Sequence, residues 1–215
     1  MIDNRLVLVT GATGFVGSRL VKELLSRGKR LRLMARSLPG NTLPGADTVI
    51  ADMQQPLTLK DAFSGVDTAY YLVHSMSGGR AGFERRDREA AENFRHAAEH
   101  AGVRRVIYLG GLGETGDGLS EHLASRLEVA HILQQGSFST TFLRAAVIIG
   151  AGSASFEMIR SLVERLPVMI TPRWVSTRCQ PIAIADVIGY LAGCLDEERT
   201  SGETFDIGGP EILTY

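Results

Sequence analysis

A glycine-rich stretch near the start of the chain, Thr10-Gly11-Ala12-Thr13-Gly14-Phe15-Val16-Gly17, constrains the fold more than any other feature. It follows the short apolar run 6–9 and opens a segment with apolar residues at Val16, Leu20 and Leu24, the spacing of one helix face. A strand that turns into a helix through three glycines is typical of a dinucleotide-binding unit. The sequence therefore predicts an α/β fold built outward from this turn.

Each glycine of the turn has a separate role in this prediction. Gly11 can adopt the backbone angles of a tight turn, Gly14 lets the backbone approach a pyrophosphate, and Gly17 permits close packing of the helix. The free amides and the helix dipole then face the phosphates. The alternative is a strand-to-helix turn that binds no ligand. The residues expected to contact the dinucleotide here are Thr10, Gly11, Thr13, Gly14, Phe15, Val16 and Gly17.

Beyond the turn, short runs rich in Val, Ile and Leu alternate with longer segments of helical period, as in a parallel sheet covered on both faces. Further strands are expected at 31–35, 48–51, 68–73, 106–109, within 140–149, and at 204–207, and helices at 15–27, 61–63, 82–100, 119–135, 156–166 and 185–195. We expect one doubly wound, mostly parallel Rossmann domain over residues 1–215. Residues 151–215 include a small, irregular and partial substrate region. The sequence stops at Tyr215, five residues after Gly208-Gly209-Pro210, so we expect it to be truncated.

Composition argues against several classes of protein. A chain of 215 residues, 44% hydrophobic, suits one domain with a full core, and a net charge of −1 gives no general attraction to nucleic acids. No uncharged stretch reaches the roughly 18–20 residues of a membrane span, so a cytoplasmic location is expected. Cys179 and Cys194 stand apart from any CxxC pair or histidine cluster, which argues against a metal and predicts ordinary core thiols. The partner is expected to be a small molecule, with a protein partner or homo-oligomer left open.

The end of the second expected strand indicates which dinucleotide is bound. Domains that bind NAD place an acidic residue there, whereas this chain has Arg36. A guanidinium can pair with a 2′-phosphate and stack on adenine, so we expect NADP(H), with NAD possible, the alternative being a solvated loop arginine. Arg32 either adds positive potential or points to solvent. Asp52 and Met53 follow the third strand, where the carboxylate either receives the adenine amino group or forms a turn.

With these residues placed, the chain resembles the extended and atypical short-chain dehydrogenase/reductase superfamily over almost its whole length. The opening TGATGFVG is that superfamily's version of the glycine turn. The stretches YYLVHSM at 70–76, RVIYLGGLG at 105–113 and QPIAIADV at 180–187 most resemble its NmrA-like and complex I accessory-subunit-like bacterial branch. The resemblance implies that Leu72, Val73 and His74 line the cofactor after the fourth strand. It also implies that the closing segment continues into further helices.

The catalytic residues of that superfamily are altered in this chain. Its members carry a serine after the fifth strand and a Tyr-x-x-x-Lys pair on the next helix. The serine position falls on Gly110 or Gly111, the tyrosine position on His122 and the lysine position on Arg126. Arginine can bind the cofactor ribose but cannot reproduce the effect of lysine on a tyrosine pKa. His122 is either a substitute acid or a partly exposed helix residue, and His74 is catalytic, lines the cofactor or is merely packed.

Three further features leave alternatives open. Arg144, at the end of the sixth strand, holds a substrate anion or pairs with a neighbouring helix, and Trp174 lines the substrate pocket or anchors the core. The mixed charges of 84–99 predict a solvated helix face rather than a partner surface. Two functions remain. One is an NADP(H)-dependent oxidoreductase or isomerase-like enzyme that acts on a small apolar or quinone-like substrate. The other is a non-catalytic dinucleotide-binding sensor or structural subunit.

Overall fold

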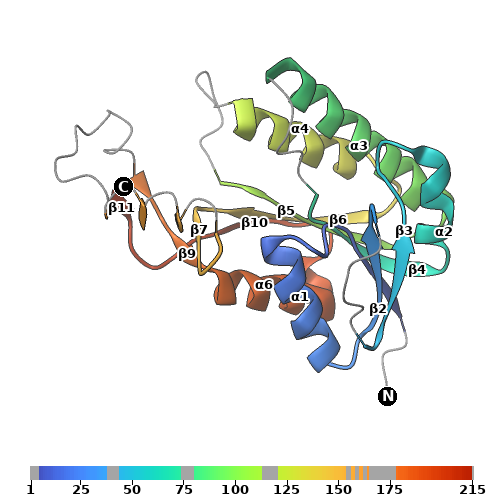
Figure 1. Cartoon of the computed structure of the whole chain (residues 1–215), viewed down its shortest axis with the longest axis horizontal. Coiled ribbons are helices and arrows are strands. Elements are labelled where there is room, and N and C mark those ends of the chain that lie inside the picture. Colours follow the sequence, from blue (N-terminus) through green and yellow to red (C-terminus); the bar gives the residue numbers. More distant parts are fainter. Residues whose placement is uncertain are drawn as a thin grey trace.

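The computed structural model describes residues 5–37, 44–73, 80–112, 121–153, 156–157, 160–161, 164 and 178–214. Within these residues one seven-stranded parallel sheet runs through the centre of the molecule, and helices cover both of its faces (Figure 1). The doubly wound α/β class expected from the sequence is therefore confirmed. No described helix is both long and apolar enough to cross a bilayer.

The elements follow the expected alternation of strand and helix. The strands of the large sheet are β1 (Leu6–Val9), β2 (Arg30–Ala35), β3 (Ala46–Ile50), β4 (Val66–Tyr71), β5 (Arg105–Gly111), β6 (Ser139–Ala145) and β10 (Thr204–Ile207). The helices are α1 (Phe15–Ser26), α2 (Leu59–Phe63), α3 (Arg80–His100), α4 (Glu121–Gln134) and α6 (Ile184–Asp196), with 3-10 turns η1 (Pro56–Thr58) and η3 (Glu198–Thr200). Two small sheets pair β7 (Ile148–Ile149) with β9 (Ile182–Ala183) in parallel and β8 (Arg178–Cys179) with β11 (Leu213–Thr214) in antiparallel.

Most expected elements are present with shifted ends. The strand at 204–207 matches, whereas the strand expected at 68–73 ends at Tyr71. It ends there because the amide of Leu72 donates to the side chain of Thr10 (3.2 Å), which turns the chain toward the glycine-rich turn. The helix expected over 156–166 falls only in part on described residues, and Pro167 and Pro172 lie outside them.

The order of strands in the large sheet locates the place where a ligand can bind. The order is β10-β6-β5-β4-β1-β2-β3, so the chain builds outward from β1 to one edge and then from β4 to the other. Open parallel sheets bind ligands outside the carboxyl ends of their strands, at the point where this direction reverses. The glycine-rich turn leaves the carboxyl end of β1 at that point.

Two layers of core hold the sheet between its helices. The layer under α2, α3 and α4 is rich in aromatic rings: Tyr71 meets Phe94 edge-on at 5.0 Å, and Tyr108 stacks on Phe142 at 5.0 Å. The layer under α1 and α6 is mainly aliphatic, with residues such as Leu20 fully buried. Figure 1 shows α3 and α4 on one side of the sheet and α1 and α6 on the other. Cys194 belongs to the aliphatic layer, but Cys179 is only half-buried on β8, so only one of the two expected core thiols is in the core.

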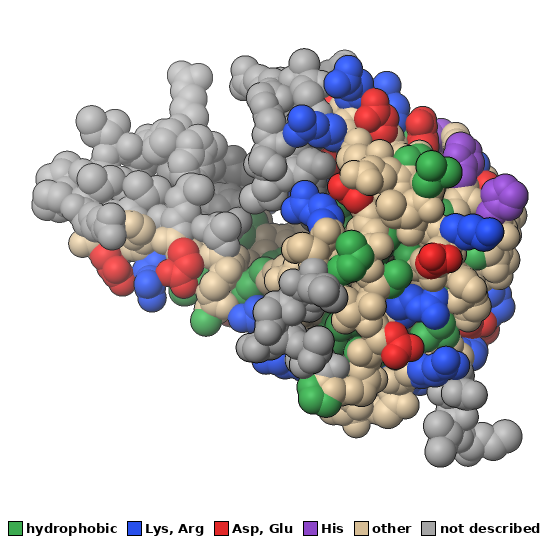
Figure 2. All heavy atoms as spheres, turned by 45° about the vertical axis from the view of Figure 1, so that its right-hand side comes forward, with side chains coloured by type: hydrophobic (Ala, Val, Ile, Leu, Met, Phe, Trp, Pro, Cys, Tyr) green, Lys and Arg blue, Asp and Glu red, His purple; other side chains and the backbone are tan. Residues whose placement is uncertain are grey.

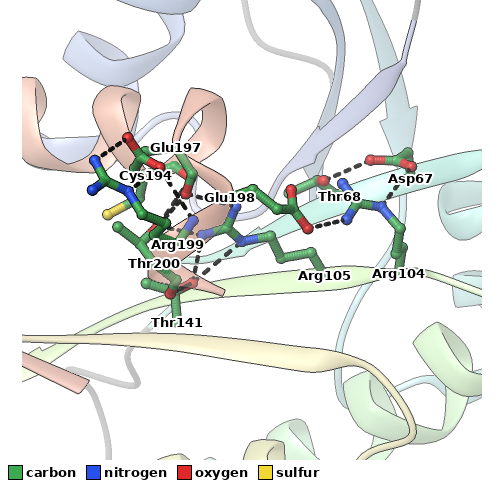
Figure 3. Close-up of polar contacts among 10 residues, drawn as sticks. All are labelled: Asp67, Thr68, Arg104, Arg105, Thr141, Cys194, Glu197, Glu198, Arg199 and Thr200. Atoms are coloured by element: carbon green, nitrogen blue, oxygen red, sulfur yellow. Dashed lines mark hydrogen bonds and ion pairs between the residues drawn. The ribbon is translucent and has the colours of Figure 1, made fainter. Parts of the chain in front are cut away.

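A buried arginine lies at the amino end of β5, the end of the sheet away from the glycine turn. Arg105 is 1% exposed, and its guanidinium donates to the hydroxyls of Thr141 (2.8 and 3.2 Å) and Thr200 (2.5 Å) (Figure 3). It also donates to the carbonyl of Glu197 at 3.5 Å. Burial lowers the pKa of Arg105. These hydrogen bonds tie β5 to β6 and to the turn η3, which leads into β10.

The surface carries charges of both signs. Basic and acidic side chains are interspersed over the face that Figure 2 shows. Many of the mixed charges of α3 lie on the expected solvated face, but Asp87 is 5% exposed and accepts a hydrogen bond from Ser125 of α4 at 3.2 Å. Asp87 shares a helix face with the buried Ala91 and Phe94, so helical spacing places it against α4. The expectation of full solvation is therefore wrong at this residue.

Candidate functional site

The glycine-rich turn has no room for side chains at two of its three glycines. Gly11 has φ +65°, and a Cβ there would lie 2.5 Å from the carbonyl oxygen of Leu72. A Cβ on Gly17 would lie 2.1 Å from the carbonyl oxygen of Gly11, so α1 packs directly on the turn that precedes it. The expected roles of Gly11 as a turn residue and of Gly17 as a packing residue are thus confirmed.

The outer side of the turn is open. Thr13 and Gly14 are exposed, and α1 begins at Phe15 without a side-chain cap and without an acidic residue in its first turn. The first amides of a helix need acceptors from outside the helix, and its amino end carries partial positive charge. The turn therefore presents unsatisfied donors and a positive dipole at the carboxyl edge of the sheet, an arrangement suited to a phosphate group.

The side chain of Thr10 points into the protein and forms hydrogen bonds there, away from the open side of the turn. Its side chain is fully buried, its hydroxyl donates to the carbonyl of Tyr70 at 2.8 Å, and the same oxygen accepts from the amide of Leu72. These bonds fix the end of β1 against the end of β4. Thr10 therefore holds the turn in place, while contacts of its neighbours with a dinucleotide stay a prediction.

The segment 150–152, which follows β7, is held beside the turn by contacts that the sequence analysis did not predict. The ring of Phe15 lies against the glycines that follow β7, 3.4 Å from the position of a Cβ on Gly150 and 4.0 Å from that on Gly152. Arg19 stacks on this ring at 4.3 Å and donates to the carbonyls of Phe15 (2.8 Å) and Ala151 (2.7 Å). The signal in the sequence is an arginine four residues after an aromatic residue at a helix start, which has a helix-internal explanation as well.

Arg36 follows β2 at the same edge of the sheet as the glycine turn. Its side chain is exposed, and no hydrogen bond or ion pair joins it to another described residue. Asp52 follows the neighbouring β3, and its Oδ1 accepts from the amide of Gln54 at 3.0 Å, which is the turn-forming alternative. Met53 is 4% exposed in the core, and its carbonyl accepts from Asn93 at 2.7 Å. A cation without a partner among the described residues and a half-buried carboxylate thus lie where the adenosine half of a dinucleotide is expected.

Arg32 does not face that region. One guanidinium nitrogen donates to the carbonyls of Asp61 (3.2 Å), Ala62 (3.2 Å) and Ser64 (2.6 Å) at the end of α2. The last carbonyls of a helix lack intrahelical partners and carry partial negative charge. A cation at this place donates hydrogen bonds to the carbonyls and stabilises the helix dipole. Both alternatives for Arg32, added potential at the cofactor and exposure to solvent, are therefore replaced by a structural role.

This role gives a prediction for Arg32→Ala. The variant is expected to lower the free energy of unfolding by about 1–2 kcal/mol, because charged hydrogen bonds to three carbonyls are lost. Chemical denaturation measures this effect. Dinucleotide affinity is expected to stay unchanged, and a drop in affinity without a drop in stability would contradict the assignment.

The residues expected after β4 are described only in part. Leu72 and Val73 are half-buried beyond the end of the strand, and the carbonyl of Leu72 touches Gly11. His74, Trp174 and the side chain of His122 lie outside the described residues. Their expected roles stay predictions.

The serine position of the catalytic set is filled by rings. A Cβ on Gly110 would lie 2.5 Å from Phe142 and 3.2 Å from Tyr108, the stacked pair under α4. A Cβ on Gly111 would lie 2.9 Å from Leu123 and 3.3 Å from the side chain of Arg126. Burial raises the pKa of Tyr108, which keeps its phenol protonated while it donates to the carbonyl of Arg126 at 3.1 Å. The expected loss of the serine hydroxyl is thus matched by packing that leaves it no space.

Arg144 pairs with a strand rather than with a helix. Its guanidinium makes two bonds to the carboxylate of Asp206 on β10, at 2.5 and 2.8 Å. The two residues are register partners on neighbouring parallel strands. The ion pair expected with a neighbouring helix is therefore made with a strand instead, and the role of Arg144 toward a substrate anion stays a prediction.

Comparison with known proteins agrees with this geometry. Residues 11–152 match the model of a family described as NAD(P)H-binding. A divinyl chlorophyllide a 8-vinyl-reductase of Arabidopsis thaliana is 24% identical over 95% of this chain and 53% of its own. A 3-beta-hydroxysteroid dehydrogenase of Mycolicibacterium neoaurum is 36% identical over 47% of this chain and 31% of its own. The chain thus spans about half the length, or less, of these curated relatives.

Solved structures share the fold. A short-chain dehydrogenase/reductase superfamily protein from Agrobacterium tumefaciens with bound NAD superimposes with a TM-score of 0.78 at 20% identity, over 98% of this chain and 79% of that one. A UDP-glucose 4-epimerase from Thermotoga maritima gives a TM-score of 0.79 at 16% identity, over 97% of this chain and 78% of that one. At these identities the likeness shows the fold alone.

Proposed function

The chain belongs to the NAD(P)H-binding family, and on this premise we propose that it is an NADP(H)-dependent reductase that delivers hydride to a conjugated organic acceptor. One observation carries the proposal: the start of α1 is uncapped and free of acidic residues behind a turn that only glycines can form. A pyrophosphate suits this place because it accepts hydrogen bonds from several amides and is stabilised by the helix dipole.

The two halves of the dinucleotide then extend in opposite directions along the edge of the sheet. Arg36 at the end of β2 marks the adenosine side, where its guanidinium suits a 2′-phosphate. The nicotinamide side consequently lies toward β4 and β5, near Leu72 and Gly111. When bound, the cofactor would supply the hydride, and the residues of this chain would fix its position.

The altered catalytic positions favour one class of acceptor. Hydride addition to an isolated carbonyl develops an alkoxide, which needs a nearby donor, and Gly110 provides no hydroxyl. Hydride addition to a conjugated carbon–carbon double bond spreads the negative charge into the acceptor, and a proton from water completes the reduction. The reductase from Arabidopsis thaliana, similar over 95% of this chain, is named for reduction of a vinyl group.

A dinucleotide-binding sensor is the second candidate, and the packing at Gly110 favours it. The stacked rings of Tyr108 and Phe142 occupy the space of the usual serine, which is compatible with a site that binds without turnover. Single-turnover oxidation of bound NADPH by a panel of conjugated alkenes separates the two. Oxidation with transfer of the cofactor's deuterium label to carbon supports the reductase, and binding without any oxidation supports the sensor.

Arg36→Ala tests the choice of cofactor. The variant is expected to weaken NADPH binding by about 1.5–3 kcal/mol, or roughly tenfold to more than a hundredfold, because a charged hydrogen-bonded pair is lost. NADH binding is expected to change little. Calorimetric titration with both dinucleotides measures the difference.

Arg30→Ala is the matched control for this experiment. Arg30 is an exposed arginine on the same strand, at the amino end instead of the carboxyl end. Its removal changes the net charge equally and is expected to leave both affinities alone. Equal losses for NADPH and NADH in Arg36→Ala would refute the 2′-phosphate assignment.

A further inference from the structure

Two arginines approach the carboxyl ends of neighbouring strands, and only one of them is paired with a carboxylate of the described residues. Arg144 on β6 is paired with Asp206 through both carboxylate oxygens. Arg126 on α4 is half-buried, with its Cδ 3.3 Å and one terminal nitrogen 3.9 Å from the position of a Cβ on Gly111, the last residue of β5. No described residue forms an ion pair with Arg126 or accepts a hydrogen bond from its guanidinium.

The position of Arg126 is fixed by its own backbone. The phenol of Tyr108 donates to its carbonyl at 3.1 Å, and the Tyr108 ring is held between Phe142 and Tyr71. The absence of a side chain at Gly111 gives the guanidinium stem its place beside the end of β5. A half-buried cation without a partner is unfavourable unless a ligand supplies the opposite charge. The protein thus holds the Arg126 cation in a defined place, and no described residue matches its charge.

Arg126 lies some distance along the sheet from the place expected for the cofactor's phosphates. β5 is two strands away from β1, with β4 between them. Neighbouring strands lie about 4.8 Å apart, so the end of β5 is roughly 10 Å from the end of β1. The pyrophosphate lies at the glycine turn that leaves β1 in the proposed function. An anion at Arg126 therefore belongs to the molecule beside the nicotinamide.

We propose that Arg126 binds a carboxylate group of the substrate, next to the carbon that receives hydride. The inference rests on the proposed function and adds the class of substrate. A planar carboxylate with one negative charge matches a single planar guanidinium with one positive charge. Among the described residues, the end of β5 has one cation without a partner, Arg126, and its single charge matches a monoanion such as a carboxylate.

The test measures the binding of benzoate and of benzamide, its uncharged counterpart, to the protein saturated with NADPH. Calorimetry is carried out on the unaltered chain, Arg126→Gln, Arg126→Lys and Arg144→Gln. Benzoate is expected to bind the unaltered chain more tightly than benzamide and to lose about tenfold or more in affinity in Arg126→Gln, the loss of a charged hydrogen bond. Arg126→Lys should restore part of the affinity. Arg144→Gln, the matched control, should bind benzoate like the unaltered chain.

The outcomes separate this inference from the function on which it rests. If NADPH does not bind the unaltered chain, the proposed function fails first. If NADPH binds but benzoate binds no better than benzamide, or binds Arg126→Gln equally well, the carboxylate inference is overturned and the function stands. It is also overturned if Arg126→Gln weakens NADPH instead of benzoate, because Arg126 then holds the cofactor.

Discussion

Replacing Gly17 by alanine is expected to reduce NADPH affinity by on the order of a hundredfold or more. The added carbon would lie 2.1 Å from the carbonyl oxygen of Gly11 and 2.8 Å from its carbonyl carbon. Both atoms are backbone, so α1 must move away from the turn, and its amides move with it. Fluorescence titration with NADPH measures the loss.

Gly189→Ala is the matched control for that substitution. Gly189 also lies in a helix, α6, but a Cβ there meets no atom within 4 Å. Alanine has the higher helix propensity, so this variant is expected to gain about 0.5–1 kcal/mol of stability and to bind NADPH normally. Normal NADPH affinity in Gly17→Ala would show that the spacing between α1 and the turn is not what forms the site.

Replacing Arg105 by alanine is expected to lower the free energy of unfolding by about 3–5 kcal/mol, through the cavity it leaves and the hydrogen bonds it removes. The side chain is 1% exposed, and its removal leaves the hydroxyls of Thr141 and Thr200 and the carbonyl of Glu197 without this donor. Because domains have a free energy of unfolding of only about 5–15 kcal/mol, the variant loses a large part of its stability. Urea denaturation measures the change.

Arg104→Ala is the control, at the preceding residue of the same strand end. Arg104 is 43% exposed and forms ion pairs with Asp67 at 3.4 Å and Glu198 at 2.8 Å (Figure 3). Exposed ion pairs contribute about 0–1 kcal/mol, so a small change is expected. Similar losses in the two variants would mean that the buried hydrogen bonds around Arg105 add nothing beyond a surface charge.

The order of elements could be predicted because each apolar run and each helical period is a local pattern. The ends of elements are less predictable, and β5 shows why. It was expected at 106–109 and spans Arg105–Gly111, because a charged residue and two glycines do not look like strand residues in sequence. Distant contacts decide these positions: Arg105 is buried against Thr141 and Thr200, and Gly110 leaves room for the ring of Phe142.

The glycine turn could be predicted because its chemistry is contained in eight consecutive residues. Which arginines pair within the protein and which are left for a ligand could not be predicted in the same way. Arg32 and Arg36 are four residues apart. Only the fold shows that Arg32 donates to carbonyls at the end of α2, about thirty residues further along the chain, whereas Arg36 stays exposed. Arg144 and Arg126 differ for the same reason, since Asp206 lies 62 residues from Arg144.

The hydrogen bonds of Arg105 also have a consequence for the order of events during synthesis. Thr200 lies 95 residues further along the chain, so a growing polypeptide carries the arginine long before this acceptor exists. Until residues 197–200 have been added, closing the sheet would bury a cation without its full set of hydrogen bonds, which is unfavourable. Parallel sheets with distant partners already form slowly. Folding is therefore expected to reach completion late, when this turn and the strand that follows it seal the sheet in one cooperative step.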